Sequence, residues 1–149
     1  MEKQVPTLEA LNKLSQELIA LLTPGETATL ITLSGELGAG KTTLTQHLAQ
    51  ALGIAESVTS PTFVLEKIYE LSHSAFLKFI HIDAYRLTGG KDLDALNFEE
   101  LLSEPTNLIV LEWPEKVADA LPTPTIAIGL TPHEDGSRTV TYIYAKDIA

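Results

Sequence analysis

One segment in the first third of the chain limits what this sequence can fold into. Residues Gly35 to Thr42 read GELGAGKT and match the pattern G-x-x-x-x-G-K-[ST] at every fixed position. Glycines allow turns that a Cβ would obstruct, and the N–H groups of such a loop converge on phosphate oxygens at a helix N-terminus. The loop needs a strand before it and a helix after it, so the pattern predicts an α/β fold that binds a nucleotide. We call residues 35–42 the phosphate loop.

The segments beside the phosphate loop have the periodicity that it requires. Residues 27–34 form a β-rich apolar run, which predicts a buried strand. From Thr42, apolar residues recur at helical spacing as far as Gly53, a residue typical of helix C-caps. Upstream, leucines at helical spacing after Thr7 predict an amphipathic helix over residues 8–22 with Thr7 as its N-cap.

The rest of the chain continues the alternation of strands and helices. Short connections predict two antiparallel hairpins, of segments 63–71 with 76–83 and 126–130 with 138–144. The apolar run 108–111 is typical of a central parallel strand. Helices are expected over 92–102 and 114–121, the second opened by a proline. We therefore expect a single α/β layered domain over residues 1–149, with a mixed sheet.

Charged and hydroxyl side chains near the loop suggest hydrolytic chemistry. Lys41 would bring a positive charge to the β- and γ-phosphates, and the Thr42 hydroxyl is placed to ligate Mg²⁺. Hydrolysis also needs carboxylates at the carboxyl ends of neighbouring strands, and Asp83 and Glu112 each end or follow a strand-like run. Each also fits a helix N-cap or a surface carboxylate, so both interpretations stay open from the residues alone.

Several other features admit two interpretations. The turn Ser60–Phe63 is either structural or a sensor of the γ-phosphate, and Arg86 is either a salt-bridge partner or a stabiliser of transferring charge. Trp113 is the only tryptophan, and the four histidines have no metal-ligand spacing. The sole Asn-Lys pair lies in the first helix, so no guanine-reading N-K-x-D element is present and adenine is favoured.

Composition narrows the classes of partner. Ten Lys and Arg against twenty Asp and Glu give a net charge of −10, which disfavours tight binding of nucleic acid by the chain alone. Cysteine is absent, which excludes disulfides and thiolate chemistry. No apolar run is long enough to span a bilayer and the N-terminal residues are polar, so we expect no membrane contact and a cytoplasmic location.

Four motifs together resemble the TsaE family, the bacterial ATPases required for threonylcarbamoyladenosine (t6A) modification of tRNA. The motifs are GELGAGKTT (Gly35–Thr43), SPTF (Ser60–Phe63), HIDAYRL (His81–Leu87) and LEWP (Leu111–Pro114). The resemblance implies a three-layer P-loop NTPase fold with a largely parallel central sheet, ATP and Mg²⁺ as ligands, and slow hydrolysis without partners. It also implies work with the two proteins that transfer the threonylcarbamoyl group to adenosine 37 of ANN-decoding tRNAs, with tRNA contacted only through them.

The resemblance also assigns site residues. It implies that Thr42 and Glu112 hold Mg²⁺ and that Asp83 lies beside the metal or the attacking water, so Asp83 and Glu112 are the candidate catalytic residues. The implied nucleotide-binding residues of the loop are Gly38, Ala39, Gly40, Lys41, Thr42 and Thr43. Thr7, Glu9 and Arg138 are the implied adenine contacts, and Trp113 is implied to lie near the nucleotide. One departure is Glu36, where many relatives have Asp.

Two other functions fit the same residues. A P-loop kinase would pass the γ-phosphate to a small metabolite, although 149 residues leave little room for an acceptor pocket. A nucleotide-gated module would control assembly of a complex through ATP occupancy without essential hydrolysis.

Overall fold

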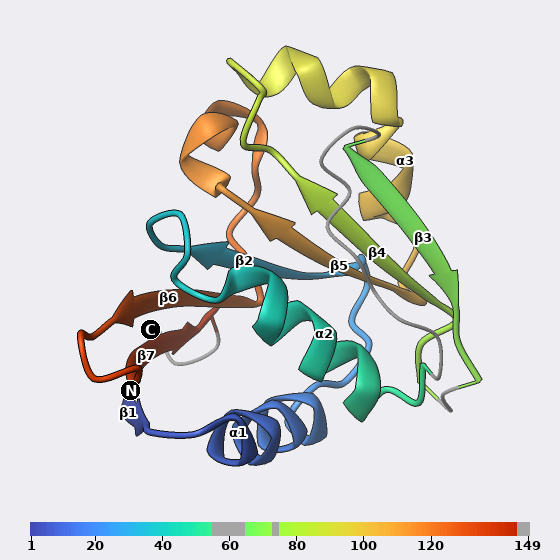
Figure 1. The fold of residues 1–149 in the computed structure, drawn as a ribbon. Coiled ribbons are helices and arrows are strands. Elements are labelled where there is room, and N and C mark those ends of the chain that lie inside the picture. The colour runs from blue at the N-terminus through green and yellow to red at the C-terminus, as the bar shows by residue number, and fades with distance from the viewer. Residues whose placement is uncertain (55–64, 73–74, 146–149) are drawn as a thin grey trace.

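The computed structural model describes residues 1–54, 65–72 and 75–145, and within these ranges seven strands form one sheet (Figure 1). The strands are β1 (Glu2–Val5), β2 (Thr29–Ser34), β3 (Glu66–Glu70), β4 (Lys78–Asp83), β5 (Asn107–Glu112), β6 (Ile126–Pro132) and β7 (Arg138–Tyr144). Their spatial order is β1-β7-β6-β2-β5-β4-β3. The four central strands β6, β2, β5 and β4 are parallel, whereas β3, β7 and β1 pair antiparallel at the two sides. This mixed sheet confirms the predicted fold class.

Helices cover both faces of the sheet and complete three layers (Figure 1). Helices α1 (Leu8–Ala20) and α2 (Lys41–Ala51) pack together on one face, which we call the α2 face. The opposite face carries α3 (Phe98–Ser103) and three short 3-10 turns, and we call it the α3 face. The turns are η1 (Gly90–Leu96), η2 (Pro114–Lys116) and η3 (Ala118–Ala120).

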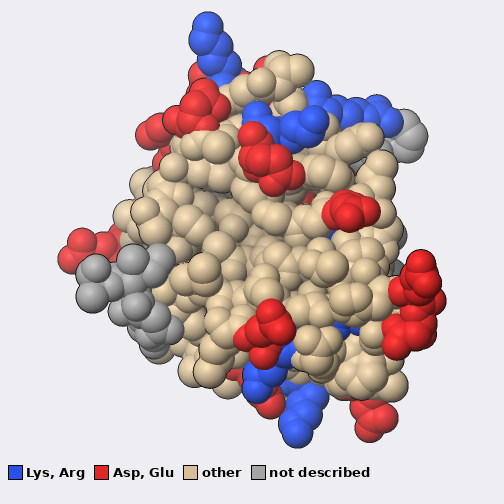
Figure 2. Space-filling model, turned by 90° about the vertical axis from the view of Figure 1, so that its left-hand side faces the viewer, with Lys and Arg blue, Asp and Glu red and all other residues tan. Residues whose placement is uncertain are grey.

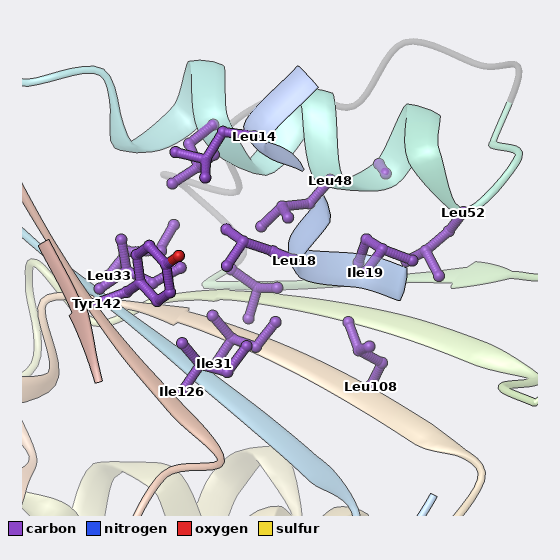
Figure 3. Close-up of a cluster of buried hydrophobic side chains, with 14 of the residues drawn as sticks. Leu14, Leu18, Ile19, Ile31, Leu33, Leu48, Leu52, Leu108, Ile126 and Tyr142 are labelled. Carbon is purple, nitrogen blue, oxygen red and sulfur yellow. The ribbon is translucent and has the colours of Figure 1, made fainter. Parts of the chain in front are cut away.

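The larger core lies between the sheet and the two long helices (Figure 3). Leu18 of α1 and Leu48 of α2 are fully buried against strand residues such as Ile31 and Leu108. The N-cap of α1 is Thr7, whose hydroxyl accepts a 3.1 Å hydrogen bond from the Ala10 N–H. Burial of these leucines fixes α2 across the sheet, and its N-terminus therefore lies at the carboxyl ends of the parallel strands.

The second core, on the α3 face, is smaller and consists of apolar residues from β2, β4 and β5 with the turns above them. Ile82 and Leu111 are fully buried there. Since side chains alternate along a strand, the next residues, Asp83 and Glu112, lie on the α2 face. The same two strand ends are therefore apolar on one face and acidic on the other.

Two sequence predictions differ from the structure, and one strand was not predicted. Residues 114–121 form two 3-10 turns instead of a helix, because Val117 is the only residue of the segment that is buried in the core and the proline at position 122 favours extended backbone at Leu121. The predicted helix over 92–102 is broken at Asn97, which has left-handed backbone with φ of 57° between η1 and α3. The sequence patterns do not predict strand β1, since Val5 is its only buried residue and backbone pairing with β7 defines it.

Candidate functional site

The phosphate loop connects the central strand β2 to the N-terminus of α2. The Gly40 backbone is left-handed, with φ of 99°, where it caps the helix, so a side chain at this position would be strained. At Gly35 a Cβ would lie 2.7 Å from the Leu130 carbonyl oxygen of β6, which only glycine tolerates. These two positions explain why the chain uses glycine at both fixed ends of the loop pattern.

A pocket of about 410 Å³ opens beside this loop. It is lined by seven of the predicted site residues, which come from three segments far apart in the sequence: Gly38, Gly40, Lys41, Thr42, Thr43, Asp83 and Glu112. Leu37, Tyr85 and Trp113 complete the wall. The size is within the usual range for small-molecule sites, and the lining joins the helix N-terminus to two carboxylates.

Lys41 is held by three groups within the site. Its ammonium donates hydrogen bonds to the carbonyl oxygens of Gly35 and Glu36, at 2.6 and 2.8 Å, and Nζ lies 4.2 Å from the centroid of the Trp113 ring. Burial lowers the pKa of Lys41, and the negative charges of Glu112, Glu115 and Asp83 oppose this shift. These contacts therefore fix the position of the Lys41 ammonium near the N-terminus of α2.

The two acidic residues reach the pocket by strand register. Asp83 pairs with Glu112 across β4 and β5, and Glu112 pairs with Leu33 of β2. Both carboxylates are buried, with exposed fractions of 9% and 3%. Asp83 Oδ1 accepts a 3.0 Å hydrogen bond from the Tyr85 N–H. The parallel sheet thus brings two carboxylates from distant segments to the side of the phosphate loop.

Glu112 has a buried histidine as its immediate neighbour. Nε2 of His81 lies 2.5 Å from Glu112 Oε2, and His81 is fully buried. The histidine precedes Asp83 by two residues, so it lies on the same face of β4. The sequence patterns do not predict this contact, because it depends on the pairing of β4 with β5.

Trp113 and Tyr85 form an aromatic wall at the pocket. Their ring centroids are 5.0 Å apart, and Trp113 has left-handed backbone with φ of 61°. The Trp113 N–H donates a 3.1 Å hydrogen bond to the Leu33 carbonyl oxygen, next to the start of the phosphate loop. A non-glycine residue in this conformation is uncommon and marks a constrained position. The constraint points the indole toward Lys41.

The donors at the pocket suit Mg²⁺. The Thr42 hydroxyl and the Glu112 and Asp83 carboxylates are hard oxygen donors, and all three residues line the pocket. Within the described ranges, no three His, Asp or Glu side chains gather into a metal cage of their own. This arrangement fits Mg²⁺, which protein sites hold with one or two carboxylates and substrate phosphates. Thr42 and Glu112, the two residues predicted to hold Mg²⁺, both line this pocket, and their role as metal ligands stays a prediction.

Arg138 lies at the other side of the loop. A Cβ at Gly40 would overlap its guanidinium, and its Nη1 is buried without a hydrogen-bond partner among the described residues. Burial lowers the pKa of His47, and the positive charge of Arg138 lowers it further. Arg138 therefore contacts the loop from β7, and its role toward adenine stays a prediction.

Three other predicted nucleotide contacts do not line the pocket. Ala39 is buried and its N–H donates a 3.0 Å hydrogen bond to the Glu36 carbonyl oxygen within the loop. Thr7 and Glu9 line a separate hollow along α1. Their roles stay predictions, and the turn Ser60–Phe63 lies outside the described residues.

The face that carries the phosphate loop has an uncharged centre (Figure 2). Charged side chains of both signs lie around its rim, and no continuous basic surface crosses this view. No helix within the described ranges is both long and apolar enough to cross a membrane.

A parallel strand, a glycine loop that caps a helix and acidic residues at the next strand ends define a P-loop NTPase fold, the fold of a class of nucleotide-binding proteins. The structure of YdiB from Bacillus subtilis has the same fold. It aligns with a TM-score of 0.76 and 26% sequence identity over 97% of this chain and 84% of YdiB.

The sequence comparisons identify the family. The model of the family described as "Threonylcarbamoyl adenosine biosynthesis protein TsaE" matches residues 5–140. The chain is 43% identical to the tRNA threonylcarbamoyladenosine biosynthesis protein TsaE of Streptomyces coelicolor, over 74% of this chain and 72% of that protein. It is 39% identical to the Treponema pallidum protein of the same name, over 78% and 82% of the two chains. This chain belongs to the TsaE family.

Proposed function

We propose that this chain is a Mg²⁺-dependent ATPase required for t6A modification of tRNA at adenosine 37. It would act on the threonylcarbamoyl transferase complex, which contains two other proteins, and it would do so in the cytoplasm. The whole chain would work as one P-loop ATPase domain. The relatives that it matches are named for t6A biosynthesis, which supports the pathway. The chemistry is supported by the pocket.

The observation that carries the proposal is the meeting of three segments at one pocket. The phosphate loop supplies Lys41 and Thr42, β4 supplies Asp83, and β5 supplies Glu112. A phosphate-binding helix N-terminus alone would suit any anion. Two buried carboxylates beside it would add a ligand for the metal ion and a group that orients the attacking water, both of which hydrolysis of a phosphoanhydride requires.

Each residue has a task that its position supports. Lys41 and the loop N–H groups would bind the β- and γ-phosphates, and Thr43 the α-phosphate. Thr42 and Glu112 would hold Mg²⁺, which neutralises negative charge on the phosphates when bound. Asp83, fixed by the Tyr85 N–H, is placed to orient water or a metal-bound ligand. Trp113 supports the Lys41 ammonium by a cation–π contact.

The charge of the chain supports an indirect relation to tRNA. A net charge of −10 and the mixed charges around the loop face oppose binding of an RNA backbone by this chain alone. The two partner proteins would then hold the RNA, and this chain would act on them through protein contacts.

ATP hydrolysis by the purified chain, measured with and without the two partners and tRNA, tests the proposal. We expect a low rate for the chain alone, strong stimulation by the complex, and loss of both in Lys41→Ala. Equal rates with and without the partners would contradict the role in the complex. A phosphorylated small metabolite formed in stoichiometric amount would instead establish a kinase.

A second experiment separates hydrolysis from nucleotide-gated assembly. In cells depleted of the native protein, a Glu112→Ala variant that binds ATP without hydrolysing it should fail to restore t6A. Full restoration by this variant would favour the assembly module. Lys41→Ala should fail under both functions and serves as the negative control.

A further inference from the structure

His81 is a buried polar residue that the proposed function leaves without a task. It is fully buried on β4, between β3 and β5, and Nε2 lies 2.5 Å from Oε2 of Glu112. A leucine or valine would fill the same place on β4 without desolvating an imidazole. We propose that His81 is a positioning residue, which holds the Glu112 carboxylate in the orientation that Mg²⁺ binding requires. The inference rests on the proposed function.

The direction of the hydrogen bond follows from the two partners. A carboxylate only accepts, so Nε2 of His81 carries the hydrogen and donates it to Glu112. The other ring nitrogen, Nδ1, is buried and has no hydrogen-bond partner within the described residues. An Nδ1 without a hydrogen is the less costly choice there, because an N–H group would lack an acceptor. The imidazole therefore donates its one N–H hydrogen bond to Glu112.

This hydrogen bond leaves the carboxylate available at the pocket. Glu112 is 3% exposed, and it is one of the residues that line the pocket. Its Oε2 atom is hydrogen-bonded to the buried His81. The carboxylates that bind metals are commonly held in this way by an outer hydrogen-bond partner, which fixes their orientation.

The alternative partner for Glu112 is Lys41. Burial lowers the pKa of Lys41, and the Glu112 carboxylate is close enough to oppose part of that shift. Even so, the two form no ion pair among the described residues: Lys41 donates to the carbonyl oxygens of Gly35 and Glu36, and Glu112 accepts from His81. The Glu112 carboxylate is therefore held by His81 and not by Lys41.

Two variants that differ only in reach test this role. The side-chain nitrogen of glutamine can take the place of Nε2, so His81→Gln keeps a donor to Glu112, whereas the shorter His81→Asn does not reach. The sole tryptophan, Trp113, lies in the pocket wall, so its fluorescence reports a Mg²⁺ titration of the ATP-bound protein. Calorimetry in EDTA gives the nucleotide affinity without metal, and thermal unfolding reports folding.

We expect His81→Asn to raise the Mg²⁺ concentration at half-saturation by about 10- to 100-fold, the usual effect of losing an outer partner. His81→Gln should titrate close to the wild type, and both should bind ATP in EDTA as the wild type does. If His81→Asn does not fold, His81→Leu takes its place with the same expectation.

The role is overturned if both variants titrate like the wild type, or if both shift equally. Weaker ATP binding by both variants in EDTA would also overturn the role, because His81 would then stabilise the fold of the site and would not act through the metal ion. A wild-type protein that binds no ATP, or binds it without responding to Mg²⁺, would overturn the proposed function itself. That result is distinguishable, since it appears before any variant is made.

Discussion

The two faces of the central sheet end differently although the same strands build both. On the α3 face, β4 and β5 end in Ile82 and Leu111, which are fully buried in an apolar core. One residue further, on the α2 face, they end in Asp83 and Glu112, which line the pocket. A single step along each strand separates the apolar core from the pocket.

The difference shows how a small chain supports a costly site. Buried carboxylates and a buried lysine are unfavourable unless their charges and hydrogen bonds are compensated. Here the residues that flank them are anchored by an apolar core on the opposite face, while the α2 face supplies the compensating donors. Substitutions on the two faces should therefore separate stability from ligand binding.

The largest effect is expected at Lys41, on the binding face. Lys41→Ala removes the positive charge proposed to bind the phosphates and should weaken ATP binding about 1,000-fold, equal to the upper range for loss of one electrostatic donor in an active site. Thermal unfolding should change little, because the wild-type protein already carries the cost of burying this ammonium. Calorimetric titration with ATP measures the loss. Lys91→Ala, an exposed lysine of η1, is the matched control and should bind normally.

Leu111→Ala should produce the opposite pattern. Leu111 is fully buried on the α3 face, so the truncation should lower the free energy of unfolding by about 2–5 kcal/mol. Chemical denaturation measures this change. The folded variant should bind ATP with nearly wild-type affinity, and a loss of affinity comparable with that of Lys41→Ala would break the distinction between the two faces.

Glu112→Gln tests the neighbouring position with almost no change of shape. The amide oxygen can still accept from His81, so the fold should persist, but the charge proposed to bind Mg²⁺ is lost. We expect hydrolysis to fall about 100-fold, within the range for removal of one electrostatic group in an active site. ATP binding in EDTA should remain. A hydrolysis rate equal to that of the wild type in this variant would show that Glu112 has no role in the site.

Gly40→Ala should give a smaller, mixed effect. The φ of 99° makes any side chain strained by about 1–2 kcal/mol, and a Cβ would also displace the Arg138 guanidinium. Gly136→Ala is the matched control, since Gly136 has φ of 88° but a Cβ there would have no neighbouring atom within 4 Å. Both variants should lose stability, and only Gly40→Ala should lose ATP affinity. Equal binding in the two would contradict the role given to the loop.

The smallest effect is a pH dependence on the α2 face. Burial, and then Arg138, lower the pKa of His47 below its usual 6.5. Between the lowered value and 6.5 the unfolded chain binds more protons than the folded one, so stability falls as the pH falls through this window. Thermal unfolding at about pH 7.5 and 5.5 should show a larger acid loss for wild type than for His47→Gln. An equal loss in both would exclude His47 as the cause.

The parts of the molecule that sequence predicted well are those with a long repeated pattern. The leucines of α1, the run before the phosphate loop and the apolar residues of α2 bury one continuous side each, and the structure has these elements where expected. Residues 114–121 lack such a pattern, since only Val117 is buried. The proline at position 114 predicted a helix there, but the structure has two 3-10 turns.

The site was predictable as a set of residues but not as a set of contacts. The loop pattern identified Lys41 and Thr42, and the strand ends identified Asp83 and Glu112, all of which line the pocket. The contact between His81 and Glu112 depends on the pairing of β4 with β5, and the overlap of Arg138 with Gly40 depends on the place of β7. Strand order is a property of the whole sheet, which local patterns do not encode.

A crystal structure with Mg²⁺ and a non-hydrolysable ATP analogue would show whether the phosphate loop and Glu112 together hold the nucleotide and its metal ion. We expect the phosphates against residues 38–43, with Mg²⁺ held by the Thr42 hydroxyl and the Glu112 carboxylate and with His81 still hydrogen-bonded to Glu112. A nucleotide bound elsewhere, or a Mg²⁺ ion that Glu112 does not approach, would contradict this expectation.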